Sequence, residues 1–174
     1  MLFRSLLDAF GREIGLERGH CPLVMLRRLM SEMYKRFEYS PKTTRVDSPI
    51  DEALQKRQGV CQDFTHMGVA FCRALNIPAR YVCGYLPDID ITPDPVPMDF
   101  HAWFEAFIDG QWRTFDARHN RPRAGRLIIA QGRDASDVAF TTSFGSARLT
   151  HMKVWADETT PDTTLDTPPN PRIF

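Results

Sequence analysis

Apolar residues recur at helical spacing in three stretches of the chain. They fall every three or four positions in residues 2–14 and 22–37, and a third apolar stripe runs through residues 61–75. This spacing predicts three amphipathic helices. A shorter helix is expected to begin at Pro49, and Gly59 is placed to end it.

Strand-forming residues dominate after these helices. Residues 79–86, 100–108 and 111–117 are rich in aromatic and β-branched side chains. The dipeptide Asp109-Gly110 separates the last two segments and is typical of a two-residue hairpin turn. The pattern therefore predicts an antiparallel hairpin within a larger sheet.

The order of the elements indicates the fold class. Residues 126–130 and 147–155 are expected to add two further strands. Helices followed by strands predict an α+β fold in which N-terminal helices pack on a C-terminal antiparallel β-sheet. We expect one domain over residues 1–156, and residues 157–174 form a tail rich in Thr, Pro and Asp with little to bury.

Composition and charge narrow the class of protein. The 174 residues are 43% hydrophobic and 25% charged, with a net charge of +0, so no basic surface points to a nucleic-acid or membrane partner. Arg4 and Asp8 interrupt the apolar N-terminus that a signal peptide requires. We therefore expect a cytoplasmic protein with reduced thiols. None of the four cysteines has the C-x-x-C spacing of a usual zinc site.

Cys61 has the sequence context of a nucleophile. It follows Gly59 and opens a predicted helix, where free N–H groups and the helix dipole stabilise a thiolate. The same N–H groups can donate to an oxyanion on an attacked carbonyl. Cys72 and Cys83 lie within a predicted helix and a predicted strand, so we interpret them as structural residues.

His101 and Asp116 are brought together by the register of the predicted hairpin. A two-residue turn at Asp109-Gly110 places Trp103 opposite Asp116. His101 then lies diagonally from Asp116 on the same face, about 7–8 Å away along the backbone. An imidazole and a carboxylate can bridge that distance with a hydrogen bond, although register alone also allows a surface pair.

The remaining histidines have weaker cases. His66 lies five residues beyond Cys61 on the same helix, so the two side chains diverge by roughly 140° and His66 is interpreted as structural. His119 is close enough to Asp116 to shape the site. His20 and His151 have no partner that the sequence identifies.

Aromatic residues near His101 are candidates for contact with a substrate. We assign substrate contacts to Trp103 and Tyr85, and Trp112 could wall the same site. The alternative is that both tryptophans belong to the core of the sheet. The backbone N–H of Cys61 is the expected first oxyanion donor, and Gln55 and Tyr39 are candidates for the second.

Several segments together resemble the bacterial branch of the transglutaminase-like superfamily. They are Gly59-Val60-Cys61-Gln62-Asp63-Phe64, the run from Ile77 to Tyr85, His101-Ala102-Trp103, Phe115-Asp116 and the run from Gly132 to Asp137. The order of Cys, then His-Ala-Trp, then Asp is the signature of this family. The resemblance implies a papain-like core with a Cys61–His101–Asp116 triad and amide chemistry through a thioester on a protein or peptide substrate.

The resemblance leaves the reaction open, because the family includes cross-linking transferases, proteases and amide hydrolases. Similar bacterial proteins carry a β-rich domain ahead of the catalytic one, so this chain is either a minimal form or lacks that domain. No cofactor or metal is expected. A binding module that has lost turnover and a zinc enzyme using Cys61, His101 and His119 are the alternatives.

Hydrolysis is favoured over cross-linking because no clear water-excluding device is apparent. The only candidate cover is the proline-rich loop from Pro87 to Asp99. Its four aspartates could attract a cationic amine or a basic substrate segment, although a solvated acidic loop is the more common case.

Overall fold

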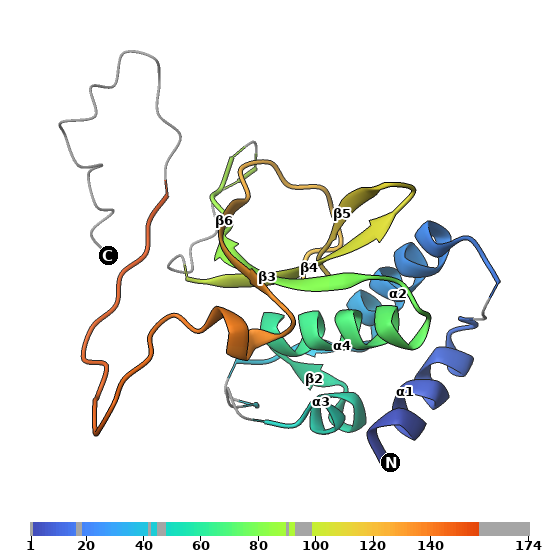
Figure 1. The fold of residues 1–174 in the computed structure, drawn as a ribbon, viewed down its shortest axis with the longest axis horizontal. Coiled ribbons are helices and arrows are strands. Elements are labelled where there is room, and N and C mark those ends of the chain that lie inside the picture. The colour runs from blue at the N-terminus through green and yellow to red at the C-terminus, as the bar shows by residue number, and fades with distance from the viewer. Residues whose placement is uncertain are drawn as a thin grey trace.

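The structure is a computed structural model that describes residues 2–16, 19–41, 43–44, 48–89, 91–92 and 99–156. Its helices are α1 (Leu2–Glu13), α2 (Pro22–Arg36), α3 (Ile50–Lys56) and α4 (Cys61–Ala74), followed late in the chain by the 3-10 helix η1 (Ala135–Val138). Its strands are β1 (Glu38–Tyr39), β2 (Gln58–Gly59), β3 (Ala79–Tyr85), β4 (His101–Ile108), β5 (Gln111–Phe115) and β6 (Leu127–Gly132). This order of elements is the predicted α+β arrangement (Figure 1).

The main sheet is antiparallel, with the strand order β5-β4-β3-β6. Ile108 pairs with Gln111 and Phe107 pairs with Trp112 around the turn at Asp109 and Gly110, so the predicted hairpin register is confirmed. Asp109 has a φ of 53°, and Gly110 has a φ of 78°. Positive φ at both central residues is what a type I′ hairpin turn requires.

Helix α4 packs closely against the centre of the sheet. A Cβ atom added to Gly68 of α4 would lie 2.1 Å from the ring of Phe104 on β4. Phe104 is 1% exposed. The absence of a side chain at Gly68 therefore lets the helix approach the sheet, and this approach sets the position of Cys61 at the start of α4.

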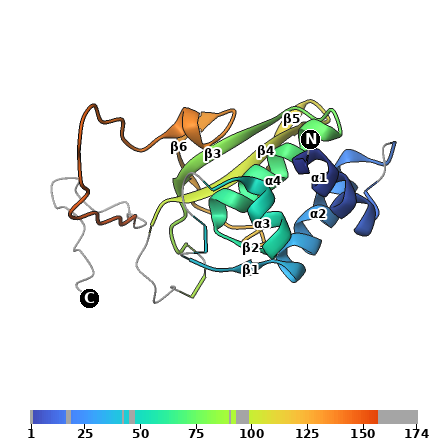
Figure 2. The ribbon, with the colours of Figure 1, turned by 90° about the horizontal axis from the view of Figure 1, so that it is seen from below.

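The other helices build the rest of the core on the same side of the sheet (Figure 2). Phe10 of α1 contacts Phe37 and Phe71, with ring centroids 5.4 and 5.8 Å apart. Arg57 covers this aromatic group from outside, 4.5 Å from the Phe10 ring, and pairs with Glu13. No helix among the described residues is long and apolar enough to cross a membrane.

Two details of the helical half differ from expectation. Helix α3 ends at Lys56, before Gly59 is reached, and its C-cap residue Arg57 adopts a left-handed conformation with a φ of 55°. The following residues form β2, which pairs in parallel with β1, so that Tyr39 lies opposite Gly59. Two strands of two residues each carry no detectable alternation, so the pattern of apolar residues could not reveal them.

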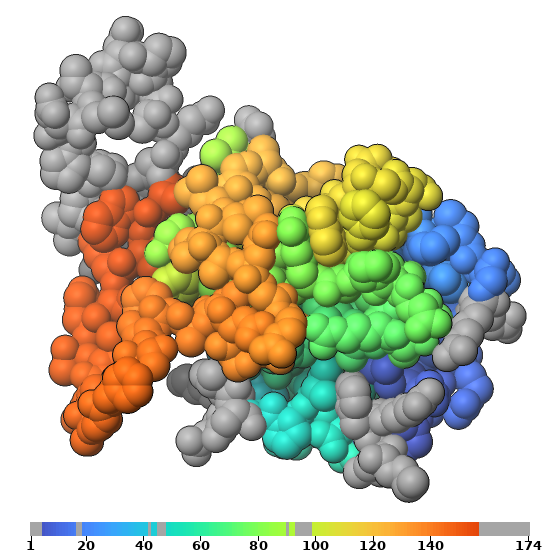
Figure 3. Space-filling model, viewed as in Figure 1, coloured from blue at the N-terminus to red at the C-terminus, as the bar shows by residue number. Residues whose placement is uncertain are grey.

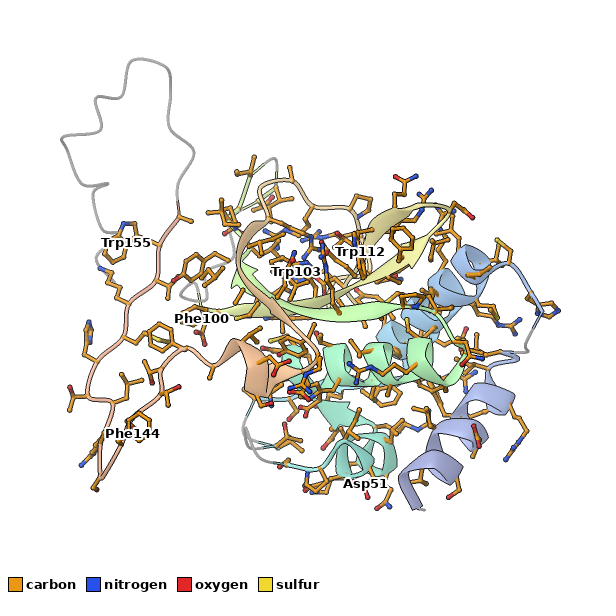
Figure 4. The ribbon with its side chains drawn as sticks, in the orientation of Figure 1. Asp51, Phe100, Trp103, Trp112, Phe144 and Trp155 are labelled. Atoms are coloured by element: carbon orange, nitrogen blue, oxygen red, sulfur yellow. The ribbon has the colours of Figure 1, made fainter. Side chains whose placement is uncertain are left out.

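The predicted strand at residues 147–155 is wrong. Residues 139–156 form no helix or strand and run away from the sheet (Figure 1). Phe144 is 98% exposed and Trp155 is 45% exposed, and both are labelled in Figure 4. Alternation supports a strand only where a neighbouring strand accepts its hydrogen bonds, and no described strand does so here. Residues 157–174, the predicted tail, lie outside the described residues.

Candidate active site

The imidazole of His101 and the carboxylate of Asp116 form a buried pair. His101 Nε2 lies 2.8 Å from Asp116 Oδ2. His101 is 3% exposed and Asp116 is 7% exposed. His101 begins β4 and Asp116 directly follows β5, so the hairpin register produces the pair that the sequence predicted.

Asp116 collects hydrogen bonds from several directions. Its Oδ2 atom also lies 3.2 Å from His119 Nδ1 and accepts from Arg126 Nη2 at 3.0 Å. Its Oδ1 atom accepts from the backbone N–H groups of Arg118 and His119. Although burial alone would raise the pKa of Asp116, hydrogen bonds from His101 and His119 lower it well below its usual range. The carboxylate is therefore ionised and accepts from every neighbour.

The ionised carboxylate fixes the tautomer of His101. An ionised carboxylate can only accept hydrogen bonds, so the proton of the His101 ring is on Nε2, and Nε2–H donates a hydrogen bond to Asp116. Burial lowers the pKa of His101, although the hydrogen bond to Asp116 acts in the opposite direction. His101 Nδ1 is therefore an unprotonated acceptor, and it is buried without a hydrogen-bond partner among the described residues.

Cys61 is held at the start of α4 by local hydrogen bonds. Asp63 accepts from the backbone N–H of Val60 at 2.8 Å and from Thr44 Oγ1 at 2.6 Å. Thr65 Oγ1 donates to the carbonyl oxygen of Cys61 at 2.7 Å. Asp63 thus satisfies one free donor at the helix start and ties the loop ahead of it to the helix.

The surroundings of Cys61 connect it to the strand of His101. Cys61 packs against a small cluster of buried residues that contains Tyr81, Ala102 and Val138. A backbone hydrogen bond from Ala102, the residue after His101, and the charge of Asp116 both act on the thiol. The thiol does not form a hydrogen bond with His101 Nδ1 in this arrangement.

The expected ionised thiol at Cys61 is a point of correction. Burial raises the pKa of Cys61 to about 11, and hydrogen bonds from the backbone at Ala102 and Gln62 only partly offset this effect. Desolvation therefore outweighs the helix start, which was the feature that favoured a thiolate. With His101 also unprotonated, the resting site holds a neutral thiol and a neutral imidazole.

The other cysteines and His66 have structural surroundings, as predicted. Cys72 is fully buried, and burial raises its pKa to about 12. Cys83 is partly buried beside the same cluster as Cys61. His66 Nε2 accepts the backbone N–H of Ala135 at 3.1 Å, so this ring attaches η1 to α4. Figure 3 shows η1 and β6 (orange) lying against the green residues of the body.

The tryptophans do not line a surface around Cys61. Trp103 is 1% exposed, and its ring stacks with that of His101 at a centroid distance of 6.1 Å. Its assignment as a substrate contact is therefore corrected to a buried support for His101. Trp112 is exposed next to Phe107 near the turn of the hairpin, at the opposite end of β4 from His101 (Figure 4).

Tyr85 and the two candidates for the second oxyanion donor, Tyr39 and Gln55, differ in their surroundings and in their exposure. Tyr85 is partly buried, with its ring 5.0 Å from that of Phe100, the residue before His101. Tyr39 lies near enough to Cys61 for the two groups to influence each other electrostatically. Gln55 is exposed on α3. Of the two donor candidates, Tyr39 has the structural support.

The zinc set proposed from the sequence is not assembled. Among the described residues, the group that could hold a metal ion consists of His101, Asp116 and His119, without Cys61. The Arg126 guanidinium already donates to Asp116 Oδ2 at 3.0 Å, and an arginine cation at this distance opposes a second cation there. The Cys61–His101–His119 set is therefore not formed, and the charge of Arg126 opposes a metal ion at the group of His101, Asp116 and His119.

Two arginines at this site were missed by the sequence analysis. Arg126 pairs with Asp116 and lies over the Trp103 ring, with its Cζ 4.9 Å from the ring centroid. Arg118 lies over the Tyr39 ring at 3.9 Å. The only available signal was an excess of arginines in residues 113–126 directly after β5, and such a run usually indicates a solvated surface.

Comparison with known proteins decides the family. Residues 12–117 match the transglutaminase-like superfamily. This chain belongs to the transglutaminase-like superfamily. The match contains Cys61, His101 and Asp116, and the α+β fold described above is that of the superfamily.

Individual proteins have sequences similar to this chain, and one solved structure has a similar fold. A candidate cysteine protease from Cytophaga hutchinsonii is 33% identical and superposes with a TM-score of 0.69, over 88% of this chain and 55% of that protein. An uncharacterized protein of Mycobacterium leprae is 37% identical over 106 residues, covering 60% of this chain. An uncharacterized protein of Mycobacterium bovis is 34% identical over 132 residues, covering 67% of this chain. The chain spans 38% and 40% of the length of these two relatives.

Proposed function

We propose that this transglutaminase-like protein is a cysteine-nucleophile amide or peptide hydrolase with a Cys61–His101–Asp116 triad. The observation that carries the proposal is the buried His101–Asp116 pair at 2.8 Å, whose free Nδ1 atom belongs to the strand that contacts Cys61. The similarity to a candidate cysteine protease from Cytophaga hutchinsonii supports the same class of chemistry.

The neutral thiol and neutral imidazole define the first step of the proposed reaction. His101 Nδ1 accepts the proton of Cys61 as the sulfur attacks a carboxamide or peptide carbonyl carbon. Asp116 holds the ring through Nε2 and stabilises the imidazolium that forms. The oxyanion accepts one hydrogen bond from the backbone N–H of Cys61 and a second from the hydroxyl of Tyr39.

Collapse of this intermediate releases the amine. His101 returns its proton to the departing nitrogen as the C–N bond breaks, which leaves a thioester on Cys61. Water then attacks the thioester carbon while His101 again accepts a proton. The C–S bond breaks, the acid leaves, and His101 returns the proton to the sulfur of Cys61. Hydrolysis is proposed over transfer because it requires only access for water at the thioester.

Substitution of the triad tests the proposal. Cys61→Ala should abolish amide hydrolysis while the thermal unfolding midpoint changes little, because loss of one sulfur at a helix start leaves a small cavity. His101→Ala should cost nearly as much, and Asp116→Asn somewhat less, because triad residues act as a unit. Cys72→Ala is the control for loss of a thiol elsewhere on α4. Full turnover by Cys61→Ala would exclude the mechanism.

A glutamine-containing peptide offered with and without a primary amine separates hydrolysis from transfer. Mass spectrometry of the product should show the free acid as the main product even at millimolar amine. If the amine adduct is more abundant than the acid, the protein is a cross-linking transferase. If Cys61 forms no acyl-enzyme with any amide and the fold is intact, the domain is a binding module.

A further inference from the structure

The guanidinium of Arg118 lies close to the groups that would carry out the reaction. Burial sets the direction of the pKa shifts of Cys61, His101 and Tyr39, and the charge of Arg118 acts on all three groups. These side chains come from α4, β4 and β1, which are distant in sequence. A single cation that influences all three therefore lies at the place where these elements meet.

Arg118 is held in this place by two contacts. Its Cζ atom lies 3.9 Å from the centroid of the Tyr39 ring. Its backbone N–H donates to Asp116 Oδ1 at 3.1 Å. Tyr39 is itself fixed opposite Gly59, two residues before Cys61. The guanidinium of Arg118 is thus stacked on the strand beside the nucleophile, and the backbone of Arg118 is bonded to the carboxylate of Asp116.

Among the described residues, no carboxylate pairs with the guanidinium of Arg118. Within the described part of the chain, most other partly buried arginines have carboxylate partners: Arg57 pairs with Glu13, Arg80 with Glu105, Arg123 with Asp88 and Arg126 with Asp116, and Arg113 is the exception. Arg118 is only partly buried and has no such partner among the same residues. Asp99, whose charge also acts on Tyr39, accepts from the backbone N–H of Phe100.

We propose that Arg118 binds a carboxylate of the substrate next to the carbonyl that Cys61 attacks. This inference rests on the proposed hydrolase function and narrows its substrates to amides that carry an acidic group beside the cleaved bond. A guanidinium stacked on an aromatic ring keeps its N–H edge free, and that edge matches the two oxygens of a carboxylate.

The acidic loop before His101 suggested a positively charged substrate, whereas a carboxylate bound by Arg118 requires a negatively charged one. Two of the four aspartates of that loop, Asp90 and Asp94, lie outside the described residues. Asp88 is paired with Arg123, so its charge is largely neutralised. The charge of Arg118 acts on Cys61, whereas Asp116, the other charge that acts on this thiol, is paired with Arg126, so the cation favours a negatively charged group near the nucleophile.

Two alkylating reagents that differ in charge test directly whether a cation acts at Cys61. Iodoacetate carries a carboxylate and iodoacetamide a neutral amide, and the sulfur of Cys61 displaces iodide from either one. The ratio of the two rates cancels the fraction of ionised thiol, because both reactions use the same thiolate. Peptide mass spectrometry of the folded protein gives this ratio separately for Cys61 and for the exposed Cys21.

The iodoacetate-to-iodoacetamide ratio at Cys61 should exceed that at Cys21 by roughly fivefold, as expected for one close cation at a partly solvated site. Arg118→Gln should remove this excess, and Arg118→Lys, which keeps the charge, should retain most of it. Arg121→Gln removes an exposed arginine three residues away and should leave the ratio unchanged. An equal ratio in the wild type and in Arg118→Gln would overturn the inference.

A pair of substrates then tests recognition during turnover. Peptide amides that differ only by glutamate or glutamine beside the cleaved bond should differ in kcat/KM by roughly tenfold in favour of glutamate, and Arg118→Gln should remove the preference. A glutamate preference that survives in Arg118→Gln would overturn the role of Arg118. If neither reagent alkylates Cys61 and no amide is cleaved, the proposed function fails, and this inference fails with it.

Discussion

Gly84 of β3 lies directly opposite His101 of β4. A Cβ atom at Gly84 would lie 2.0 Å from the carbonyl oxygen of Leu127 on β6 and 2.8 Å from the ring of Trp103. The pairing of β3 with β6 also changes register between Cys83 and Gly84. The strand that pairs with His101 therefore has space for hydrogen only at this position.

Gly84→Ala should reduce turnover more than it reduces stability. The added methyl group must displace β6 or the ring of Trp103, and the Trp103 ring stacks on that of His101. We expect a loss of at least about tenfold in kcat, because small displacements of catalytic groups are costly. Steady-state kinetics and thermal unfolding should be compared with Cys83→Ala, which adds no atoms to the neighbouring position. Wild-type kcat in Gly84→Ala would show that the close contact is not needed.

The pH dependence of Cys61 alkylation follows from its burial. A pKa raised to about 11 means that the thiol is mostly protonated at neutral pH and ionises only as the pH rises well above 8.5, the usual value for cysteine. The rate of alkylation by iodoacetamide should therefore still be increasing at pH 9.5, whereas the exposed Cys21 serves as the internal reference. A plateau below pH 8 would instead show that Cys61 and His101 form a thiolate–imidazolium pair.

Arg126→Gln should move the acidic limb of the pH–rate profile to higher pH. His101 must be neutral to accept the proton of Cys61, and burial lowers its pKa. Without Arg126, the charge of Asp116 is shared by fewer donors and stabilises the His101 imidazolium more strongly. The limb in kcat/KM should shift upward by about one pH unit. Arg123→Gln is the control, because Arg123 contacts Asp88 and the Pro87 carbonyl instead. An acidic limb that does not shift in Arg126→Gln would show that Arg126 does not influence the pKa of His101.

Gly68→Ala should destabilise the fold. The new methyl group would overlap the buried Phe104 ring, and overpacking of this kind costs roughly 1–3 kcal/mol of unfolding free energy. Gly11→Ala in α1 is the matched control, because its Cβ would meet its nearest neighbour, Phe71, at 3.5 Å, an ordinary contact distance. That variant should gain about 0.5–1 kcal/mol from helix propensity. Denaturant unfolding of both variants measures the contrast, and equal stabilities would contradict close packing of α4 on the sheet.

His66→Gln should loosen η1 selectively. The Ala135 N–H donates to a neutral His66 ring, and burial lowers the pKa of that ring. This contribution to stability is complete above about pH 6.5, the unfolded value, and is lost as the pH falls through the lower folded value. The protection factor of the Ala135 amide in hydrogen exchange, which corrects for the chemical rate, should fall in acid in the wild type and should already be low at neutral pH in the variant. A protection factor that does not change with pH would show that His66 does not stabilise η1.

The sequence predicted the features that depend on local patterns. Helical spacing located three of the α-helices, residues typical of helix ends located α3, and the two-residue turn at Asp109-Gly110 predicted the register that joins His101 to Asp116. It could not predict the ionisation of Cys61, because desolvation depends on how Tyr81, Ala102 and Val138 close around it. Arg118 and Arg126 were missed for the same reason, since their partners Tyr39 and Trp103 are far from them along the chain.

The exposed segment after η1 is connected by aromatic contacts to the start of β4. The ring of Phe140 lies 4.7 Å from that of Phe100, which in turn lies 5.0 Å from Tyr85. Phe100 immediately precedes His101. A load applied to residues 141–156 would therefore reach the base of the proposed triad through one aromatic contact and one peptide bond, without passing through the helical core.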